Sequence, residues 1–198
     1  MTQTQPPNTV NDKTITGATE ANNDPDNSPW YALRIFCSHQ KEIAETLQAH
    51  GYEIFIPMEL VGVEDSNRHI KQHLRPVVRN LLFIKKKDKE ATLRQLIQGI
   101  RYPISIIKKE VGSNLFYEIP AHQMSEFQAM CNPDILEKQY LGEEQARLKI
   151  GTKVIVAYGP LKGLRGRLVR SNKRYFLLKE VPGLGVMLKV TRWCCKAI

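Results

Sequence analysis

One stretch decides how the last quarter of this chain folds: Lys153-Val154-Ile155-Val156-Ala157-Tyr158-Gly159-Pro160-Leu161-Lys162-Gly163-Leu164-Arg165-Gly166. Its apolar first half predicts a β-strand that runs into a tight loop. Gly159 and Gly163 permit a positive φ and a close approach of the backbone in that loop, and Gly166 lets the chain reverse into the next strand. Lys162 and Arg165 are expected to project from the loop.

Short strands are predicted from this stretch to the end of the chain. Turn signals occur at Gly159-Pro160, Ser171-Asn172-Lys173 and Pro182-Gly183, and apolar segments lie between them. About five short strands at this spacing, within residues 147–198, predict a small SH3-like β-barrel.

Positive charge is concentrated in the same region. The whole chain has a formal net charge of +9, and residues 147–198 hold 13 Lys or Arg against one acidic residue, Glu180. A block this basic usually meets phosphate or an acidic protein surface, although it can also be a merely solvated surface. Residues 1–28 have the opposite character, because they are net acidic and contain no Phe, Trp, Tyr or Leu. They predict a disordered acidic tail.

Residues 29–131 alternate between strand and helix patterns. Strand signals begin at Trp30 and recur at 52–58, 77–85 and 104–108, with a polar hairpin predicted over 61–75. Helical periodicity covers 41–50 and 89–99, and a third helix is predicted to begin at Pro120. This order predicts an α+β domain, in which helices pack on a mainly antiparallel sheet. Residues 132–146 are acidic and poor in apolar side chains, so they are interpreted as a linker.

Sequence motifs for catalysis and metal binding are missing. The chain contains no GxSxG, P-loop, HExxH or GxGxxG motif and no CxxC pair. His69 and His73 stand at i, i+4, but in a stretch that predicts a hairpin. We therefore expect neither an enzyme nor a metal or cofactor site. No secretory signal and no apolar run long enough for a membrane span is visible, which favours a cytoplasmic protein that does not bind membranes.

The stretch over 153–166 resembles the KOW motif, which opens the small barrel of NusG proteins and of several ribosomal proteins. The N-terminal domain is similar to that of the NusG family of transcription elongation factors. Trp30-Tyr31 resembles the start of that domain, and Ile54-Phe55-Ile56-Pro57 resembles the segment after its first helix. Arg75-Pro76-Val77-Val78-Arg79-Asn80-Leu81-Leu82-Phe83-Ile84 is similar to the family's aromatic, Pro-Gly or Pro-Asn, Tyr and apolar strand. The resemblance covers residues 29–198.

Several positions depart from the family pattern. Val78, Arg79 and Leu81 stand where the family usually has an aromatic residue, Pro and Tyr. Asn80 in place of Gly resembles the specialised paralogues rather than the housekeeping factor. Together with the acidic tail, this indicates an operon-specific antiterminator, most similar to the UpxY-type factors of capsular polysaccharide operons.

The resemblance implies that the N-terminal domain binds the clamp helices of bacterial RNA polymerase and promotes processive transcription. By position, the contacting side chains would be Tyr31, Phe55, Val78, Leu81 and Phe83. Because side chains alternate along a strand, one face of the strand that carries Leu81 and Phe83 must be core. Each of these side chains can therefore be either a contact or part of the core.

The resemblance also implies surfaces for nucleic acid, either exposed non-template DNA or nascent RNA. One would be the lysine cluster that precedes the second helix, one the first helix, and one the KOW loop. Stacking and hydrogen bonding to splayed bases would suit the first helix. The candidate residues are His39, Lys41, Lys85, Lys86, Lys87, Lys162 and Arg165.

The loop over 181–186 lies where NusG proteins expose an apolar tip to a ribosomal protein or to Rho. Leu184 and Gly185 are the candidate contacts, and Leu184 is expected to be exposed. Two other functions remain open at this point: a ribosome-associated RNA-binding KOW protein, and the general housekeeping NusG.

Overall fold

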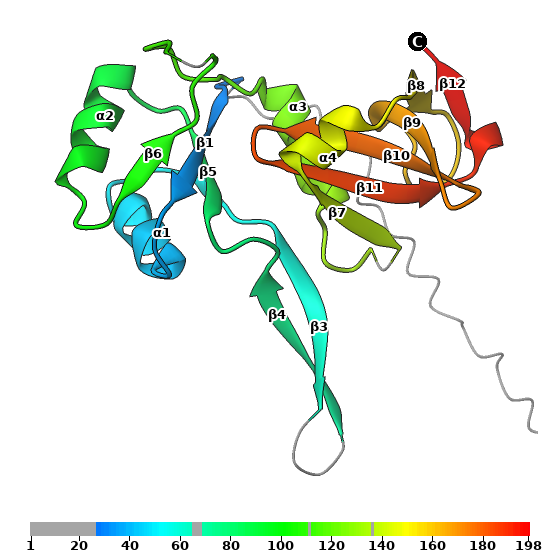
Figure 1. Ribbon diagram of the computed structural model, residues 1–198, viewed down its shortest axis with the longest axis horizontal. Coiled ribbons are helices and arrows are strands. Elements are labelled where there is room, and N and C mark those ends of the chain that lie inside the picture. The colour runs from blue at the N-terminus through cyan, green and yellow to red at the C-terminus, as the bar shows by residue number, and fades with distance from the viewer. Residues whose placement is uncertain (1–26, 65–68, 111, 136) are drawn as a thin grey trace, which may run out of the picture.

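The structure is a computed structural model that describes residues 27–64, 69–110, 112–135 and 137–198 (Figure 1). The predicted acidic tail, residues 1–28, lies outside the described residues except for its last two. A four-stranded sheet with helices forms the N-terminal region and a six-stranded antiparallel sheet forms the C-terminal region, which confirms the predicted α+β class. The elements are β1 (Trp30–Ile35), α1 (Gln40–Ala49), β2 (Ile54–Phe55), β3 (Met58–Glu64), β4 (Ile70–Pro76), β5 (Leu81–Lys85), α2 (Glu90–Gly99), β6 (Ile104–Ile106), α3 (Ala121–Met130), β7 (Lys138–Gly142), α4 (Glu143–Leu148), β8 (Thr152–Val156), β9 (Arg165–Ser171), β10 (Arg174–Val181), β11 (Leu184–Val190), a 3-10 turn η1 (Arg192–Cys194) and β12 (Cys195–Ala197).

The N-terminal sheet has the strand order β2-β5-β1-β6, and all of its pairs are antiparallel. Leu33 of β1 lies opposite Leu82 of β5, and both side chains point to the face that packs against α1 and α2. There they join Ile43 and Leu47, which lie one helical turn apart on α1. The opposite face of the same two strands packs against α3. The sheet is therefore buried on both sides.

A two-stranded hairpin of β3 and β4 extends away from the N-terminal sheet (Figure 1). It confirms the hairpin predicted over 61–75, although its pairing already begins between Met58 and Pro76. The strand predicted over 77–85 starts only at Leu81, because residues 77–80 form a turn. In this turn the amide of Val77 donates to the carbonyl of Pro57 at 2.9 Å instead of to a sheet neighbour.

Gln40, at the start of α1, holds this turn in place. Its side-chain amide donates to the carbonyl of Val78 at 3.0 Å and to that of Leu81 at 2.7 Å. Gln40 is 5% exposed and is the one buried polar side chain among the described residues. The turn over 77–80, which belongs to the segment that resembles the family, is therefore anchored to α1 by a buried side chain.

Replacing Gln40 with Leu should lower the free energy of unfolding by about 1–3 kcal/mol, because both carbonyls would lose their donor in a buried place. Gln48→Leu, on the exposed side of the same helix, is the matched control and should change stability by no more than about 0.5 kcal/mol. Urea denaturation of the two variants measures both effects. Equal losses in the two variants would contradict an anchoring role for Gln40.

The C-terminal sheet has the strand order β12-β8-β9-β10-β11-β7. The loop after β8 confirms the predicted glycine roles, with φ values of +88° at Gly159 and +93° at Gly163. Gly166 differs from the prediction, because it lies inside β9 rather than at a reversal. A Cβ at Gly166 would lie 2.6 Å from the carbonyl oxygen of Leu178, so glycine is needed there for the close approach of β10.

The segment interpreted as a linker, 132–146, differs from that interpretation. It contains β7, in which Tyr140 lies opposite Val186 of β11, and the start of α4, which buries Ala146 against the C-terminal sheet. A Cβ at Gly185 would lie 2.6 Å from the Cβ of Ala146, so a small residue meets a glycine at this contact. Composition missed both elements because β7 is held through backbone pairing and α4 through one small side chain. The C-terminal sheet therefore includes residues from Lys138 onward, and we use the name C-terminal domain for this part of the chain.

Candidate functional site

One apolar face of the N-terminal sheet is shared by α3 and the C-terminal domain. Leu81 and Phe83 project from β5 onto this face. The ring of Phe83 packs edge-on against Phe127 of α3, with the ring centroids 5.7 Å apart. Phe55 of β2 completes the aromatic group, 6.2 Å from Phe83 and 6.5 Å from Phe127. Aromatic groups of this size dominate the energetics of cores and interfaces alike.

The turn between β10 and β11 lies directly on Leu81. Val181 and Leu184, on either side of the turn, belong to the same apolar cluster as Leu81 and Phe83. Gly183 has a φ of +89°, and a Cβ there would lie 2.9 Å from Cδ1 of Leu81. Glycine is thus required twice, for the left-handed backbone and for the close contact. The C-terminal domain covers this part of the N-terminal face.

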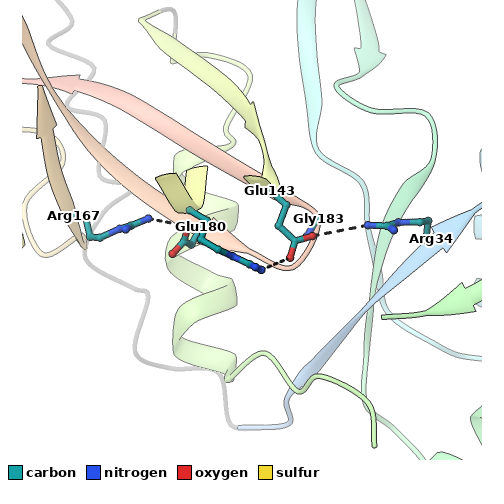
Figure 2. A network of polar contacts seen from close by, with 6 residues as sticks. Arg34, Glu143, Arg167, Glu180 and Gly183 are labelled. Carbon is teal, nitrogen blue, oxygen red and sulfur yellow. Dashed lines mark hydrogen bonds and ion pairs between the residues drawn. The ribbon is translucent and has the colours of Figure 1, made fainter. Parts of the chain in front are cut away.

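Glu143, the first residue of α4, contacts both the turn between β10 and β11 and strand β1 of the N-terminal sheet (Figure 2). Its carboxylate accepts a hydrogen bond from the amide of Gly183 at 3.2 Å and lies 3.9 Å from the guanidinium of Arg34 on β1. Arg147, one turn along α4, donates to the same carboxylate at 3.0 Å. Since these ion pairs are largely exposed, each contributes little energy. The ion pair with Arg34 is the contact that joins Glu143 to the N-terminal domain, whereas the hydrogen bond to Gly183 lies within the C-terminal domain.

α3 supplies the polar contacts on the other side of the turn. The side-chain amide of Gln123 donates to the backbone carbonyl of Glu180 at 2.9 Å. Glu126 forms an ion pair with Lys179 of β10, and the two side chains are 15% and 13% exposed. A pair this sheltered from solvent is sensitive to the loss or reversal of either charge.

Four of the five predicted polymerase contacts lie on the apolar face that the C-terminal domain shares. Leu81 and Phe83 are buried there, and Phe55 and Val78 are half-buried. The structure does not bring Tyr31 to them, because its side chain lies on the opposite face of the sheet.

Tyr31 is held in the core behind the sheet. Its ring meets the edge of Phe116 at 5.7 Å, and its hydroxyl donates to the carboxylate of Glu118 at 3.0 Å. Burial raises the pKa of Tyr31 to about 12. This side chain therefore stays neutral and inside the N-terminal domain.

The expectation that Leu184 is exposed is wrong for this structure. Leu184 is 2% exposed, because the turn that precedes it is docked on the N-terminal domain rather than directed to solvent. Gly185 is also buried, under Ala146 of α4. Both predicted partner contacts of the C-terminal domain are thus covered by the chain itself.

The predicted lysine cluster is only partly available for nucleic acid. Lys85 and Lys86 form ion pairs with Glu53 at 3.3 Å and with Glu118 at 2.6 Å. Lys87 is exposed, and its ammonium lies 5.6 Å from the centre of the Tyr52 ring. The two paired lysines stabilise the N-terminal domain internally, so Lys87 is the best placed of the three to meet phosphate.

The other nucleic-acid candidates lie apart from this cluster. His39 is stacked on Tyr102, with ring centroids 4.6 Å apart and an angle of 12° between the rings. Lys41 is exposed and lies 3.7 Å from Glu45 on the same helix. Lys162 and Arg165 are exposed on the C-terminal domain. The seven candidates therefore lie at the same three places that the sequence distinguishes, and their binding to nucleic acid stays a prediction.

Sequence reasoning missed the polar side chains that hold the domains together. Gln123 and Glu126 occur in the helix that was predicted to begin at Pro120, but the prediction gave neither side chain a role. Lys179 was one of the cations of the basic region over 147–198, and Glu143 was one of the acidic residues of the segment interpreted as a linker. Nothing in the sequence names the residues that these four side chains contact.

Within the described ranges, no group of His, Cys, Asp or Glu is arranged to hold a metal ion. No helix in the same ranges is long and apolar enough to cross a membrane.

Comparison with known proteins identifies the N-terminal domain. The model of the family described as transcription termination factor nusG matches residues 28–128, which are 101 of the 198 residues. The match covers the four-stranded sheet, the hairpin of β3 and β4, and α3 nearly to its end. No curated protein matches the chain. The chain therefore belongs to the NusG family, whose members are non-enzymatic transcription factors that bind RNA polymerase.

Proposed function

We propose that this chain is a specialised elongation and antitermination factor that binds the clamp helices of bacterial RNA polymerase in the cytoplasm. The polymerase would occupy the apolar face that carries Phe55, Val78, Leu81 and Phe83. The observation that supports this proposal is the cover on that face, made by the turn at Gly183 and the Lys179–Glu126 ion pair. A cover of this kind favours a factor that acts on selected polymerases over one that engages every polymerase.

Polymerase and the C-terminal domain would compete for the same face. Contacts between domains of one chain resemble transient protein interfaces, so an open form is accessible. A ligand that binds only the open form shifts the molecule toward it, by as much as its affinity for the two forms differs. Bound across the clamp, the N-terminal domain would favour the processive state of the polymerase without making or breaking a bond.

The finer assignment rests on the departures at Val78, Arg79, Asn80 and Leu81. They favour a UpxY-type factor that serves one long operon, such as one for capsular polysaccharide, over the general NusG. Transcript profiling after deletion separates these two. Loss of distal transcripts in one long operon supports the specialised factor, and a genome-wide defect would support the general one.

The C-terminal domain would act as a KOW domain once it is released. Leu184 would then leave the shared apolar cluster and, with Gly185 beside it, present an apolar tip to a ribosomal protein or to Rho. Because Leu184 and Leu81 are buried in the same contact, both partner surfaces would become available in one step. The polymerase contact and the KOW contact are therefore coupled in this proposal.

A pull-down of the full chain tests the polymerase assignment. The chain should retain RNA polymerase, and Val78→Glu should weaken retention by about tenfold or more, since an unpaired buried carboxylate costs more than ~1.4 kcal/mol. Val63→Glu, at an exposed position of the β3–β4 hairpin, is the matched control and should bind normally. Retention of ribosomal subunits without polymerase would instead favour the ribosome-associated alternative.

A further inference from the structure

Two large aromatic side chains are exposed together at the end of the C-terminal domain. Trp193 is 74% exposed and Tyr158 is 54% exposed. Their rings are stacked, with centroids 6.3 Å apart and an angle of 29° between them. A stacked pair of this size with both rings more than half exposed is unusual, because such side chains normally bury their rings or meet a partner.

The backbone holds the aromatic pair in place. Tyr158 follows β8 and Trp193 lies in η1, and the amide of Ala157 donates to the carbonyl of Cys194 at 2.7 Å between these segments. Figure 1 places β8 and β12 at the end of the C-terminal domain that is remote from α1 and α2. The segments that carry the pair adjoin β8 and β12, and none of the contacts described above between the C-terminal domain and the N-terminal domain involves Tyr158 or Trp193.

Cationic side chains surround these rings. The ammonium of Lys196 lies 5.8 Å from the centre of the Tyr158 ring. A shallow groove beside Trp193 is lined by Arg174, Tyr175 and Arg192, among others. Arg170 of β9 lies opposite Tyr175 of β10, and its guanidinium is 5.8 Å from the centre of the Tyr175 ring. Aromatic rings and cations therefore lie next to one another over the loop after β8 and over β9, β10, η1 and β12.

The described part of the chain offers few carboxylates to neutralise these cations. Glu180, the one acidic residue after Glu144, is already bonded to Arg167 at 2.8 Å. Glu137 is bonded to Lys189 at 2.6 Å. Arg174, Arg192 and Lys196 form no ion pair among the described residues. Their charge is left for an external anion.

We propose that this surface, centred on Tyr158 and Trp193, binds single-stranded RNA. Exposed rings stack on unpaired bases, and arginine and lysine side chains beside them bind the phosphates that link those bases. A duplex has no free base faces for such rings, and an acidic protein surface would use the cations but not the stacked pair. The choice of RNA over DNA rests on the proposed function, because the transcript is the single strand that an elongating polymerase releases.

Fluorescence anisotropy of a labelled 20-nucleotide single-stranded RNA with the full chain tests the proposal. Trp193→Ala should weaken binding by roughly 5- to 150-fold, the loss of one stacking platform. Trp193→Phe keeps a ring and should recover most of the affinity. Phe36→Ala removes an aromatic side chain that is 63% exposed on the N-terminal domain and should leave binding unchanged.

The cations have a separate signature. Arg192→Gln and Lys196→Gln should each reduce the slope of log affinity against log salt by about 0.7, as expected for one lost phosphate contact on a single strand. Emission from Trp193 should also be quenched by RNA, while Trp30, the second tryptophan, is buried and should respond little.

Three results would overturn the proposal: equal binding by Trp193→Ala and the unchanged chain, equal or tighter binding of single-stranded DNA or duplex RNA, and binding of poly-glutamate in place of RNA. Retention of polymerase by Trp193→Ala shows that the N-terminal domain is intact. A loss of RNA binding with polymerase retained therefore concerns this surface alone, and a loss of polymerase with RNA binding retained concerns the proposed function alone.

Discussion

Reversing the charge of Lys179 should open the contact between the two domains and raise the affinity of the chain for RNA polymerase. In Lys179→Glu, a second carboxylate would face Glu126 in a place where both side chains are largely shielded from water. Like charges placed together in an interface cost several kcal/mol, so the open fraction should rise by more than about tenfold.

The double variant Glu126→Lys/Lys179→Glu is the matched control. It restores opposite charges at the same two positions and should return both the closed form and the original affinity for polymerase. A single variant that behaves like the unchanged chain would show that this ion pair does not hold the cover. A double variant that stays open would show that the change at Lys179 acts through something other than charge.

Cys131 provides an independent readout of opening. It lies at the end of α3 within the shared apolar cluster, and the hydroxyl of Tyr140 on β7 donates to its carbonyl at 3.4 Å. Burial raises the pKa of the Cys131 thiol to about 12, so in the closed form the thiol is protonated and unreactive. Alkylation followed by peptide mass analysis should show faster labelling of Cys131 in Lys179→Glu and normal labelling in the double variant.

Gly183→Ala should destabilise the closed form more than Gly163→Ala does. Both glycines have left-handed backbones, with φ values of +89° and +93°, so each substitution incurs about 1–2 kcal/mol of strain. A Cβ at Gly163 would meet nothing within 4 Å, whereas one at Gly183 would lie 2.9 Å from Leu81. The added overpacking should cost about 1–3 kcal/mol beyond the strain.

Chemical denaturation, with Cys131 labelling in parallel, measures the difference between the two glycine variants. Gly183→Ala should both lower stability and increase labelling, and Gly163→Ala should only lower stability. The double variant Gly183→Ala/Leu81→Ala makes room for the methyl group. It should remove the part of the stability loss that Gly183→Ala owes to overpacking. Equal stability and equal Cys131 labelling in the two single variants would mean that the turn is not closely packed against Leu81.

The sequence was sufficient to predict what periodicity and turn chemistry determine. The strand signal at Trp30, the helical periodicity over 41–50 and the glycines at 159 and 163 all predict local features, and the structure has them. The features that the sequence did not predict share one cause, because each of them depends on a partner that is distant in sequence. β7 forms because residues around Tyr140 pair with the edge of β11, and the composition of residues 132–146 gives no sign of that pairing.

At the candidate site, too, contacts with residues distant in sequence could not be predicted. Alternation along β5 identifies Leu81 and Phe83 as sharing a face, but it cannot tell what covers that face. Leu184 lies where the sequence predicts an exposed hairpin tip, and its burial follows from the apolar cluster that it shares with Leu81, a residue distant in sequence. Gln40 likewise has the sequence of a surface residue on an amphipathic helix. Its side-chain amide bonds to two carbonyls that lie 38 and 41 positions away, at Val78 in the turn and at Leu81 at the start of β5.

The inclusion of β7 in the C-terminal sheet has a further consequence, which concerns the tether. If β7 stays paired to β11, the released domain is joined to α3 only by residues 131–137. Such a segment spans at most about 25 Å when fully extended, at 3.3–3.6 Å per residue. A short tether keeps the effective concentration of the released domain in the millimolar range. Recapture of the open face is then a first-order event within the same molecule, and a polymerase must outcompete it by affinity or by remaining bound, whatever the cellular concentration of the factor.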